Sequence, residues 1–317
     1  MRNGARSKRR RQQVRETMQD GSKTGRDRET GPAEREGGRA LEPGLHFIAT
    51  PIGSARDITL RALDILKSAD VLAAEDTRSL RHLMEIHGVA LAGRPLVAYH
   101  DHNGAAVRPK LLRALEEGKT VVYASEAGTP LVADPGYQLA RAVIEAGLPL
   151  HSAPGPSAVL TALTLSGLPS DRFLFAGFPP NTRGARLNWL AEFKTIPATL
   201  VFYESPKRIR EMLRDSVQTF GAGRQAALCR ELTKRFEEVR RGNLEDLLEG
   251  LEAAQVKGEL VLVIDRVPAV EIDEEELAAL LKAALSQGSL RDAVDQVAAD
   301  TGLARRKVYQ AALALEK

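Results

Sequence analysis

The chain has 317 residues, of which 43% are hydrophobic and 27% are charged. This length is typical of two globular domains, and no apolar stretch approaches the roughly 18 residues that a membrane-spanning helix requires. The single cysteine, Cys229, excludes an intramolecular disulfide and a structural zinc site of the thiolate-rich kind. No apolar segment of a secretory signal is visible, so we expect a cytoplasmic protein.

Basic residues are concentrated at the amino terminus. Residues 1–40 contain 12 Lys and Arg against 6 Asp and Glu, whereas the other residues contain 33 against 36. The segment has almost no large apolar side chains, so burial cannot offset the entropy lost on ordering it. We therefore expect residues 1–43 to form a disordered basic tail. It is either an electrostatic arm for RNA or a solubilising extension.

Apolar runs of strand length alternate with helical patterns from residue 45 onward. We expect strands at 45–49, 70–74, 96–99, 119–124, 148–151, 172–176, 198–203, 224–229 and 259–264. Between the first two runs, apolar residues recur every three or four positions from Ile58 to Ala69. That spacing predicts an amphipathic helix with Asp57 as its N-cap. The alternation of strands and helices predicts an α/β chain with largely parallel sheets.

Glycine and proline residues mark the expected domain boundaries. A small-residue helix ends at Gly167, which predicts a first α/β domain over 44–168 and a second over 169–268. Residues 271–317 then form a purely helical end of three helices. Its last two helices flank a Thr-Gly-Leu turn, in the manner of a helix-turn-helix, and Arg305, Arg306 and Lys307 begin the last one. These cations are predicted to contact nucleic acid; the alternative is a bundle for docking or dimerisation.

Six segments place glycines, prolines or small residues next to an expected strand. They are "ATPIGSARDITL", "ASEAGTPLVADPG", "SAPGPSAVLTAL", "FYESPKRI", "CRELTKRFEEV" and "KGELVLVI". Each segment alone is explained equally well by a tight turn. In open α/β sheets, however, ligands bind at the carboxyl ends of strands, so loops from the two domains are expected to converge on one cleft.

The ordered set of motifs also resembles a known family. "TPIGxxxDI", "AAEDTR", "HDHN", "SEAGTPLxxDPG", "PGPSA", "GLPSDRF", "FYESPxR", "RELTKxFEE" and "KGE" follow one another over residues 45–265. This series resembles the small-subunit ribosomal RNA methyltransferases of the tetrapyrrole-methylase-like class. The resemblance implies two α/β domains of the tetrapyrrole-methylase type, S-adenosylmethionine in the cleft between them, and a homodimer. It further implies methylation of a cytidine ribose 2′-hydroxyl in the decoding region of small-subunit ribosomal RNA, free or in the assembled 30S subunit.

The same resemblance assigns a set of cofactor-binding residues. They are Pro51, Ala127, Gly128, Thr129, Ser157, Ala158, Tyr203, Arg230 and Gly258. Gly128 would let the backbone approach the ligand where a side chain would clash. The family usually has Asp at the position of Glu126 and Asn at that of Ser54. We therefore place the cofactor against the backbone of residues 127–129 rather than against the Glu126 carboxylate.

Methyl transfer to a hydroxyl benefits from a group that accepts or orients its proton, so a charged cluster should face the methyl group. The candidates are Glu75, Asp76, Arg78, Asp101, Glu231 and Lys234. "EDTR" has a second interpretation, as a buried ion pair that holds the first helices together. His100, His102 and Asn103 are predicted to bind RNA or to order the cleft. A His-Asp-His series without further ligands predicts no metal site.

Two other functions stay open at this point. The same fold could methylate a small molecule of the tetrapyrrole type, although a basic carboxyl-terminal appendage would then have no obvious role. A non-catalytic RNA-binding assembly factor is the other alternative, and the Asp-to-Glu change at Glu126 is the one sequence feature in its favour.

Overall fold

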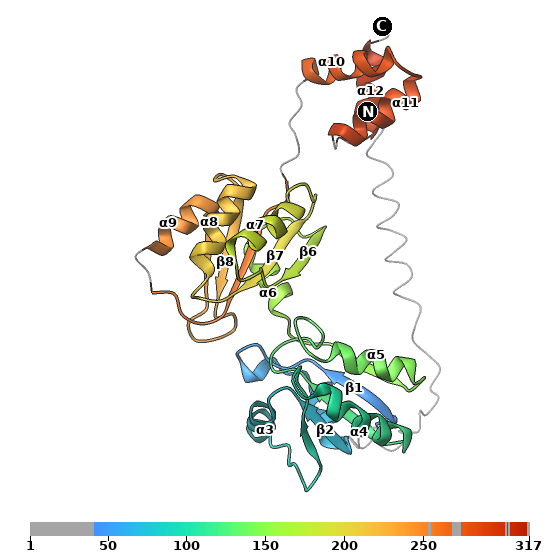
Figure 1. Ribbon diagram of the computed structural model, residues 1–317, viewed down its shortest axis with the longest axis vertical. Helices are drawn as coiled ribbons and strands as arrows, with labels where there is room; N and C mark the ends of the chain where they lie inside the picture. The colour runs from blue at the N-terminus through green and yellow to red at the C-terminus, as the bar shows by residue number, and fades with distance from the viewer. Residues whose placement is uncertain (1–40, 253–254, 268–273, 302, 304, 316–317) are drawn as a thin grey trace, which may run out of the picture. The chain divides into compact units, whose positions relative to one another are not determined.

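The computed structural model describes residues 41–252, 255–267, 274–301, 303 and 305–315 (Figure 1). Residues 1–40 of the predicted basic tail lie outside this range, so that prediction is not addressed by the structure. The described residues contain two five-stranded sheets followed by a helical segment. No helix in the described ranges has both the length and the apolar content needed to cross a membrane.

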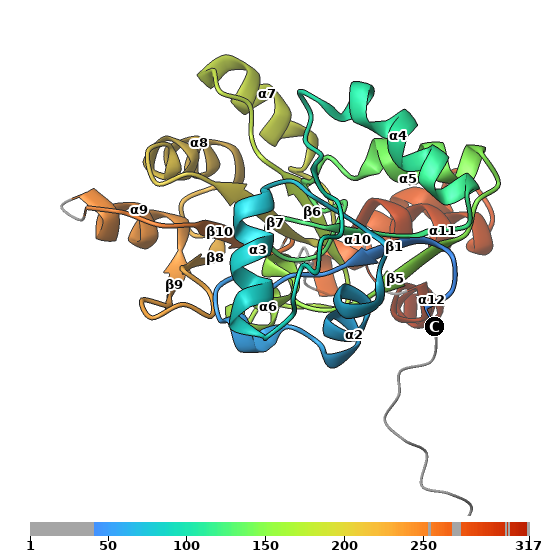
Figure 2. The ribbon, with the colours of Figure 1, turned by 90° about the horizontal axis from the view of Figure 1, so that it is seen from below.

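The first sheet is entirely parallel, as predicted. It consists of β1 (Gly44–Ile48), β2 (Val71–Ala74), β3 (Leu96–Ala98), β4 (Thr120–Ala124) and β5 (Leu150–Ala153), in the order β3-β2-β4-β1-β5. Its helices are α2 (Leu60–Ser68), α3 (Thr77–Ile86), α4 (Gly104–Glu116) and α5 (Tyr137–Glu145). Helices α2 and α3 pack on one face of the sheet, and α4 and α5 lie side by side on the other (Figures 1 and 2). Burial on both faces explains why β1, β2 and β4, whose residues are all buried, are predominantly apolar.

Helix α2 buries the predicted apolar face, but its N-cap differs from the prediction. Asp57 ends a short 3₁₀ helix, Ala55–Asp57, and Ile58 then adopts an extended backbone. The helix begins after Thr59, whose hydroxyl accepts a hydrogen bond from the Ala62 N–H at 3.1 Å. The prediction of Asp57 as the cap is therefore wrong, because the extra 3₁₀ turn moves the helix start by two residues.

The second sheet departs from the expected parallel arrangement. It consists of β6 (Phe173–Gly177), β7 (Thr199–Glu204), β8 (Gln225–Arg230), β9 (Glu238–Asn243) and β10 (Leu260–Ile264), in the order β6-β7-β10-β8-β9. The β6–β7 pair is parallel and the other three pairs are antiparallel. Antiparallel strands need only a short connection, and the loop 231–237 joins β8 directly to β9. Strand β9 was not among the predicted strands.

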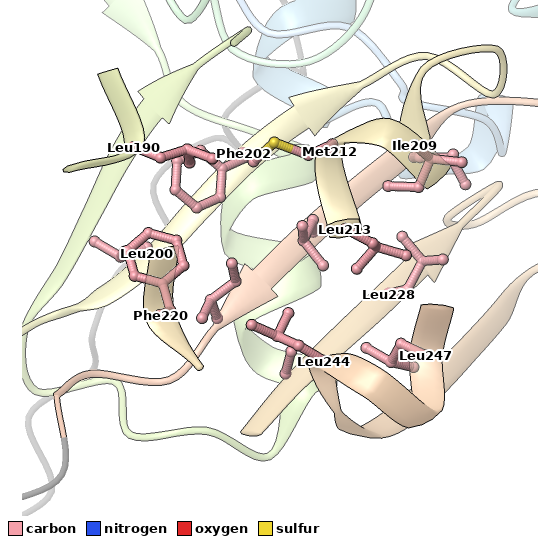
Figure 3. Close-up of a cluster of buried hydrophobic side chains, with 14 of the residues drawn as sticks. Leu190, Leu200, Phe202, Ile209, Met212, Leu213, Phe220, Leu228, Leu244 and Leu247 are labelled. Carbon is pink, nitrogen blue, oxygen red and sulfur yellow. The ribbon is translucent and has the colours of Figure 1, made fainter. Parts of the chain in front are cut away.

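Helices cover both faces of the second sheet. Helices α7 (Arg183–Glu192), α8 (Ile209–Phe220) and α9 (Leu244–Glu252) bury a large apolar cluster against one face (Figure 3). Helix α6 (Ala158–Ser166) packs on the other face, against residues of β7, β8 and β10. It begins after Ser157 and ends, as predicted, at Gly167, which has a φ of +76°. The helix before the predicted domain boundary at 168 therefore contributes its core to the second sheet.

The carboxyl-terminal segment forms three helices, as predicted. They are α10 (Glu274–Leu285), α11 (Leu290–Thr301) and α12 (Arg305–Leu315), and they share their own apolar core. Arg306 and Lys307 are exposed in the first turn of α12, whereas the Arg305 guanidinium is paired with the Asp295 carboxylate on α11. Two of the three predicted nucleic-acid contacts are thus free of ion pairs with described residues.

Candidate active site

The loops that follow the strands enclose a cavity of about 460 Å³. This volume lies in the range of ligand sites in proteins. The lining residues are Ile52, Glu75, Glu126, Ala127, Gly128, Thr129, Val132, Ala133, Asp134, Ser157, Ala158, Phe178, Tyr203, Glu204, Ser205, Pro206, Gly258, Glu259, Leu260 and Val261. Seven of the nine residues assigned to the cofactor by resemblance are among them, together with the candidate Glu75. The sequence motifs therefore meet in one place.

The "SEAGTP" loop is fixed through its backbone rather than left open for a ligand. The Gly128 N–H donates to the Thr50 carbonyl at 2.9 Å, and the Thr50 N–H donates to the Gly128 carbonyl at 3.0 Å. The Thr129 hydroxyl donates to the Pro156 carbonyl at 2.8 Å. Gly128 has a φ of +81°, which other residues rarely adopt. Both polar backbone groups of Gly128 are therefore already used, and this residue shapes the wall of the cavity.

Asp134 organises the second half of this loop and was missed from the sequence. Its carboxylate accepts hydrogen bonds from the Gly136 N–H at 2.8 Å and the Tyr123 hydroxyl at 3.0 Å. It also accepts a bond from the N–H of Leu131, and Leu131 and Ala133 both have positive φ values, 70° and 55°. Burial raises the pKa of Asp134. The sequence signal was present, because Asp before Pro-Gly is a turn pattern in which the carboxylate bonds the following backbone.

Glu75 follows β2 and directs its side chain into the cavity. Among the described residues, no hydrogen bond or ion pair holds its carboxyl group. Burial raises its pKa to about 7, and the neighbouring carboxylates of Asp134, Glu126, Asp101 and Asp76 add to this effect. Glu75 is therefore a carboxylate poised to take up a proton near neutral pH.

The rest of the "EDTR" motif is structural. Asp76 caps α3 by accepting a bond from the Arg78 N–H at 2.8 Å, and its carboxylate pairs with the Arg78 guanidinium at 3.0 Å. The Arg78 side chain is 89% exposed, so the pair is not the buried one considered above. Neither Arg78 nor the exposed Asp101 lines the cavity.

Glu231 and Lys234 lie behind the cavity wall rather than in it. The Lys234 ammonium group bridges the carboxylates of Glu231 and Glu259, at 3.0 Å from each, and Glu259 lines the cavity. Glu231 also accepts a bond from the Glu259 N–H, which is the main reason that its pKa lies below the ordinary value. This loop contacts the loop after β1, where the Ser54 N–H donates to the Thr233 hydroxyl at 3.0 Å.

Replacing Gly258 by Ala is expected to lower the free energy of unfolding by about 1–3 kcal/mol. Gly258 has a φ of +91°, and a Cβ atom there would overlap the Glu231 carboxyl group and break its bonds to Glu259 and Lys234. Chemical denaturation of the full chain measures the change. The matched control is Gly250→Ala in α9, where the nearest atom to a new Cβ is 3.8 Å away; we expect a gain of about 0.5–1 kcal/mol. Equal effects at both sites would contradict this account.

Tyr203 and Ser157 form the wall on the side of the second sheet. Burial raises the pKa of Tyr203 to about 12, so its hydroxyl remains protonated. The Ser157 Oγ accepts the N–H of Leu160 as the cap of α6, which leaves its hydroxyl proton available to a ligand. Glu204 also lines the cavity, and its buried carboxylate is held by the Arg208 guanidinium, 3.2 Å from Oε2, and by the Ser205 N–H, which donates to Oε1 at 2.7 Å.

Several predicted site residues lie outside the cavity lining. Pro51 is adjacent to the lining residue Ile52. The Arg230 guanidinium pairs with the Glu238 carboxylate at 3.0 Å and lines a separate hollow of about 90 Å³. The described residues contain no group of three or more His, Cys, Asp or Glu side chains arranged to hold a metal ion.

The "HDHN" segment is ordered by its own asparagine. The Asn103 side chain accepts a bond from the His100 N–H at 2.9 Å and donates one to the Ala98 carbonyl at 3.0 Å. Both ends of its amide are therefore used within the loop, which favours the ordering role for Asn103 over RNA contact. His102 is exposed.

Two family models match the chain in succession. Residues 44–248 match the model described as Tetrapyrrole (Corrin/Porphyrin) Methylases, and residues 271–316 match the RsmI C-terminal HTH domain. Curated relatives carry the name Ribosomal RNA small subunit methyltransferase I. The relative from Mesorhizobium japonicum is 45% identical over 279 residues, covering 88% of this chain and 94% of the relative. The one from Escherichia coli O157:H7 is 39% identical over 275 residues, covering 85% and 94%.

Solved structures show the same fold at low sequence identity. A cobalamin biosynthetic enzyme, cobalt precorrin-4 methyltransferase, superposes with a TM-score of 0.54 at 16% identity, covering 70% of this chain and 94% of that one. Diphthine synthase superposes with a TM-score of 0.55 at 18% identity, covering 70% and 89%. The arrangement of two α/β domains predicted from the motifs is therefore confirmed at the level of fold.

Proposed function

Because the chain belongs to the ribosomal RNA small subunit methyltransferase I family and carries the tetrapyrrole methylase domain, we propose that it methylates small-subunit ribosomal RNA with S-adenosylmethionine as donor. The acceptor is the ribose 2′-hydroxyl of a cytidine in the decoding region. The observation that carries the proposal is the cavity that joins the cofactor motifs of both sheets to Glu75, a carboxylate without a partner.

The volume and the charged lining of the cavity fit S-adenosylmethionine, which is a cationic methyl donor. It is lined by the carboxylates of Glu75, Glu126 and Asp134, which favour a positively charged ligand. Ser157 and Tyr203 would hold the ligand from the side of the second sheet. When bound, S-adenosylmethionine supplies an electrophilic methyl group attached to a positively charged sulfur.

Glu75 is the residue that we propose accepts the hydroxyl proton. Its carboxylate would hydrogen-bond to the 2′-hydroxyl and take the proton as the new O–C bond forms and the bond between the methyl carbon and sulfur breaks, with the electron pair of that bond left on sulfur. The adjacent carboxylates would stabilise the positive charge that develops on the oxygen. A pKa raised to about 7 makes this carboxylate a stronger base than an ordinary glutamate, while about half of it is still ionised at neutral pH.

We further propose that the carboxyl-terminal helices hold the RNA. Arg306 and Lys307 are exposed at the start of α12, where the amino-terminal end of the helix adds its positive dipole to their charges. They would contact phosphates of the small subunit and bring the target nucleotide to the cavity. A cytoplasmic homodimer remains part of the proposal through the family resemblance.

The proposal is tested with the full chain, S-adenosylmethionine labelled on its methyl group, and either purified small subunits or their free RNA. We expect one label per RNA, in a linkage that resists alkaline hydrolysis because the 2′-oxygen is blocked. Label in a porphyrinoid but not in RNA would support the small-molecule alternative. Absence of S-adenosylmethionine binding by calorimetry would support a non-catalytic assembly factor.

A further inference from the structure

Phe178 is an exposed aromatic ring at the rim of the cavity. It follows the last residue of β6, lines the cavity, and is 59% exposed. Its ring packs edge to face on the half-buried Tyr203, with centroids 5.4 Å apart, and Tyr203 in turn packs on Phe175 at 4.8 Å. Tyr203 thus packs against one part of the Phe178 ring, while much of the ring remains exposed to solvent.

The loop that carries Phe178 is held rigidly. The Arg208 guanidinium donates hydrogen bonds to the carbonyls of Pro179 at 2.6 Å and Pro180 at 3.1 Å, and also to the Asn181 side chain. Arg208 is itself oriented by the buried Glu204 carboxylate at 3.2 Å. A ligand that contacts the ring therefore does not have to order the loop first, which lowers the entropic cost of binding.

We propose that Phe178 is a stacking shelf for the base of the nucleotide to be methylated. This inference rests on the proposed function, since it assumes an RNA substrate. A ribose hydroxyl can reach Glu75 inside the cavity only if its nucleotide leaves the surrounding RNA structure. Proteins that recognise unpaired nucleotides stack the bases on aromatic side chains.

The charges at the rim favour a base over a phosphate. Glu126 and Glu259 are exposed beside the cavity, and the Glu259 side chain is 74% exposed. Lys234 pairs with Glu259 but is shared with Glu231, so these three side chains together keep a net negative charge. These carboxylates repel the phosphate groups of RNA, so the uncharged base is the part of the nucleotide that can enter. The proposed cofactor, in contrast, would lie against the wall that contains the buried residues Ser157 and Glu204.

The test compares Phe178→Ala and Phe178→Trp with Phe236→Ala. Phe236 is a matched control because its ring is 62% exposed but does not line the cavity. We expect Phe178→Ala to raise the KM for small subunits by about 10- to 100-fold, Phe178→Trp to keep it near the wild-type value, and Phe236→Ala to leave it unchanged. The affinity for S-adenosylmethionine, measured by calorimetry, should be the same in all four proteins.

The outcomes separate this inference from the proposed function. If the wild-type protein does not methylate small subunits, the proposed function fails before the shelf is tested. If the wild type is active and Phe178→Ala has an unchanged KM, the shelf is overturned while the function stands. Loss of cofactor affinity with an unchanged KM for subunits would instead place Phe178 in the cofactor site and overturn the shelf as well.

Discussion

Replacing Glu75 by Gln is expected to lower the rate of methyl transfer by about 10²- to 10⁴-fold, the usual contribution of a general base. The amide keeps the shape of the side chain and still accepts a hydrogen bond, but it cannot take up the proton. Single-turnover transfer to small subunits at saturating cofactor measures the effect. An unchanged affinity for S-adenosylmethionine by calorimetry would show that the loss lies in the chemical step. A variant within a few fold of wild type would exclude Glu75 as the proton acceptor.

The pH dependence of the wild-type rate gives an independent check on Glu75. The base must be ionised to act, so the rate should rise with pH and reach half its plateau near pH 7. Replacing the exposed Glu126 by Gln removes one of the negative charges that raise the Glu75 pKa, so the rise should move to lower pH. Glu192→Gln, at the exposed end of α7, serves as the control because Glu192 is not among the charges that raise this pKa. Identical profiles for these two variants would contradict tuning by the carboxylate cluster.

Folding of the Glu75→Gln variant is not expected to account for the loss. The pKa of Glu75 is higher in the folded chain than its ordinary value of 4.5, so the native state binds this proton more tightly than the unfolded chain. The associated stability is present below pH 4.5 and is lost as the pH rises to about 7. Removing the carboxylate should therefore raise the melting temperature at pH 8. A lower melting temperature at that pH would contradict the unfavourable environment assigned to Glu75.

The fold could be predicted from the sequence wherever strands are buried on both faces. All nine predicted strands are present, and most of them are short apolar runs bounded by turn residues. The exception is β5, whose sequence LHSA is mixed and whose predicted range of 148–151 overlaps the observed strand only at residues 150 and 151. Strand β9 was missed because it lies at the edge of its sheet and carries one apolar residue, Val239, among charged and polar ones. Its Arg241 is held by a partner distant in sequence, the Leu165 carbonyl. A local sequence pattern cannot predict contacts between residues that are distant in sequence.

The missed strand also explains where Arg230 lies. The motif assigned this residue to the cofactor, but β8 pairs with β9 so that Arg230 stands opposite Glu238, and the two side chains form an ion pair. The roles of Gly128 and Asp134 were hidden for a similar reason, since Gly128 bonds to Thr50 across a bridge between two loops. Spacing and composition could predict that these loops converge. They could not predict which polar groups are used up in holding the loops together.

Replacing Arg186 by Ala is expected to cost about 3–5 kcal/mol of unfolding free energy, as breaking a buried ion pair typically does. The Arg186 side chain is 1% exposed and the Asp215 side chain 3%, and the Arg186 Nε donates to the Asp215 Oδ2 at 2.7 Å. Arg186→Ala leaves the Asp215 carboxylate buried, and its one remaining cationic partner among the described residues is Arg183, whose side chain is 70% exposed. Denaturant unfolding of the full chain measures the loss.

The matched control for Arg186 is Arg141→Ala, which breaks an ion pair of the same length at the surface. Arg141 and Glu145 are 2.7 Å apart with side chains 56% and 63% exposed, so we expect a loss of no more than about 1 kcal/mol. The double variant Arg186→Met with Asp215→Leu should lose less stability than Arg186→Ala, because no buried charge is left unpaired. A double variant less stable than Arg186→Ala would contradict this account, because it would show that Asp215 stabilises the fold without Arg186, through its second ion pair with Arg183 at 3.2 Å.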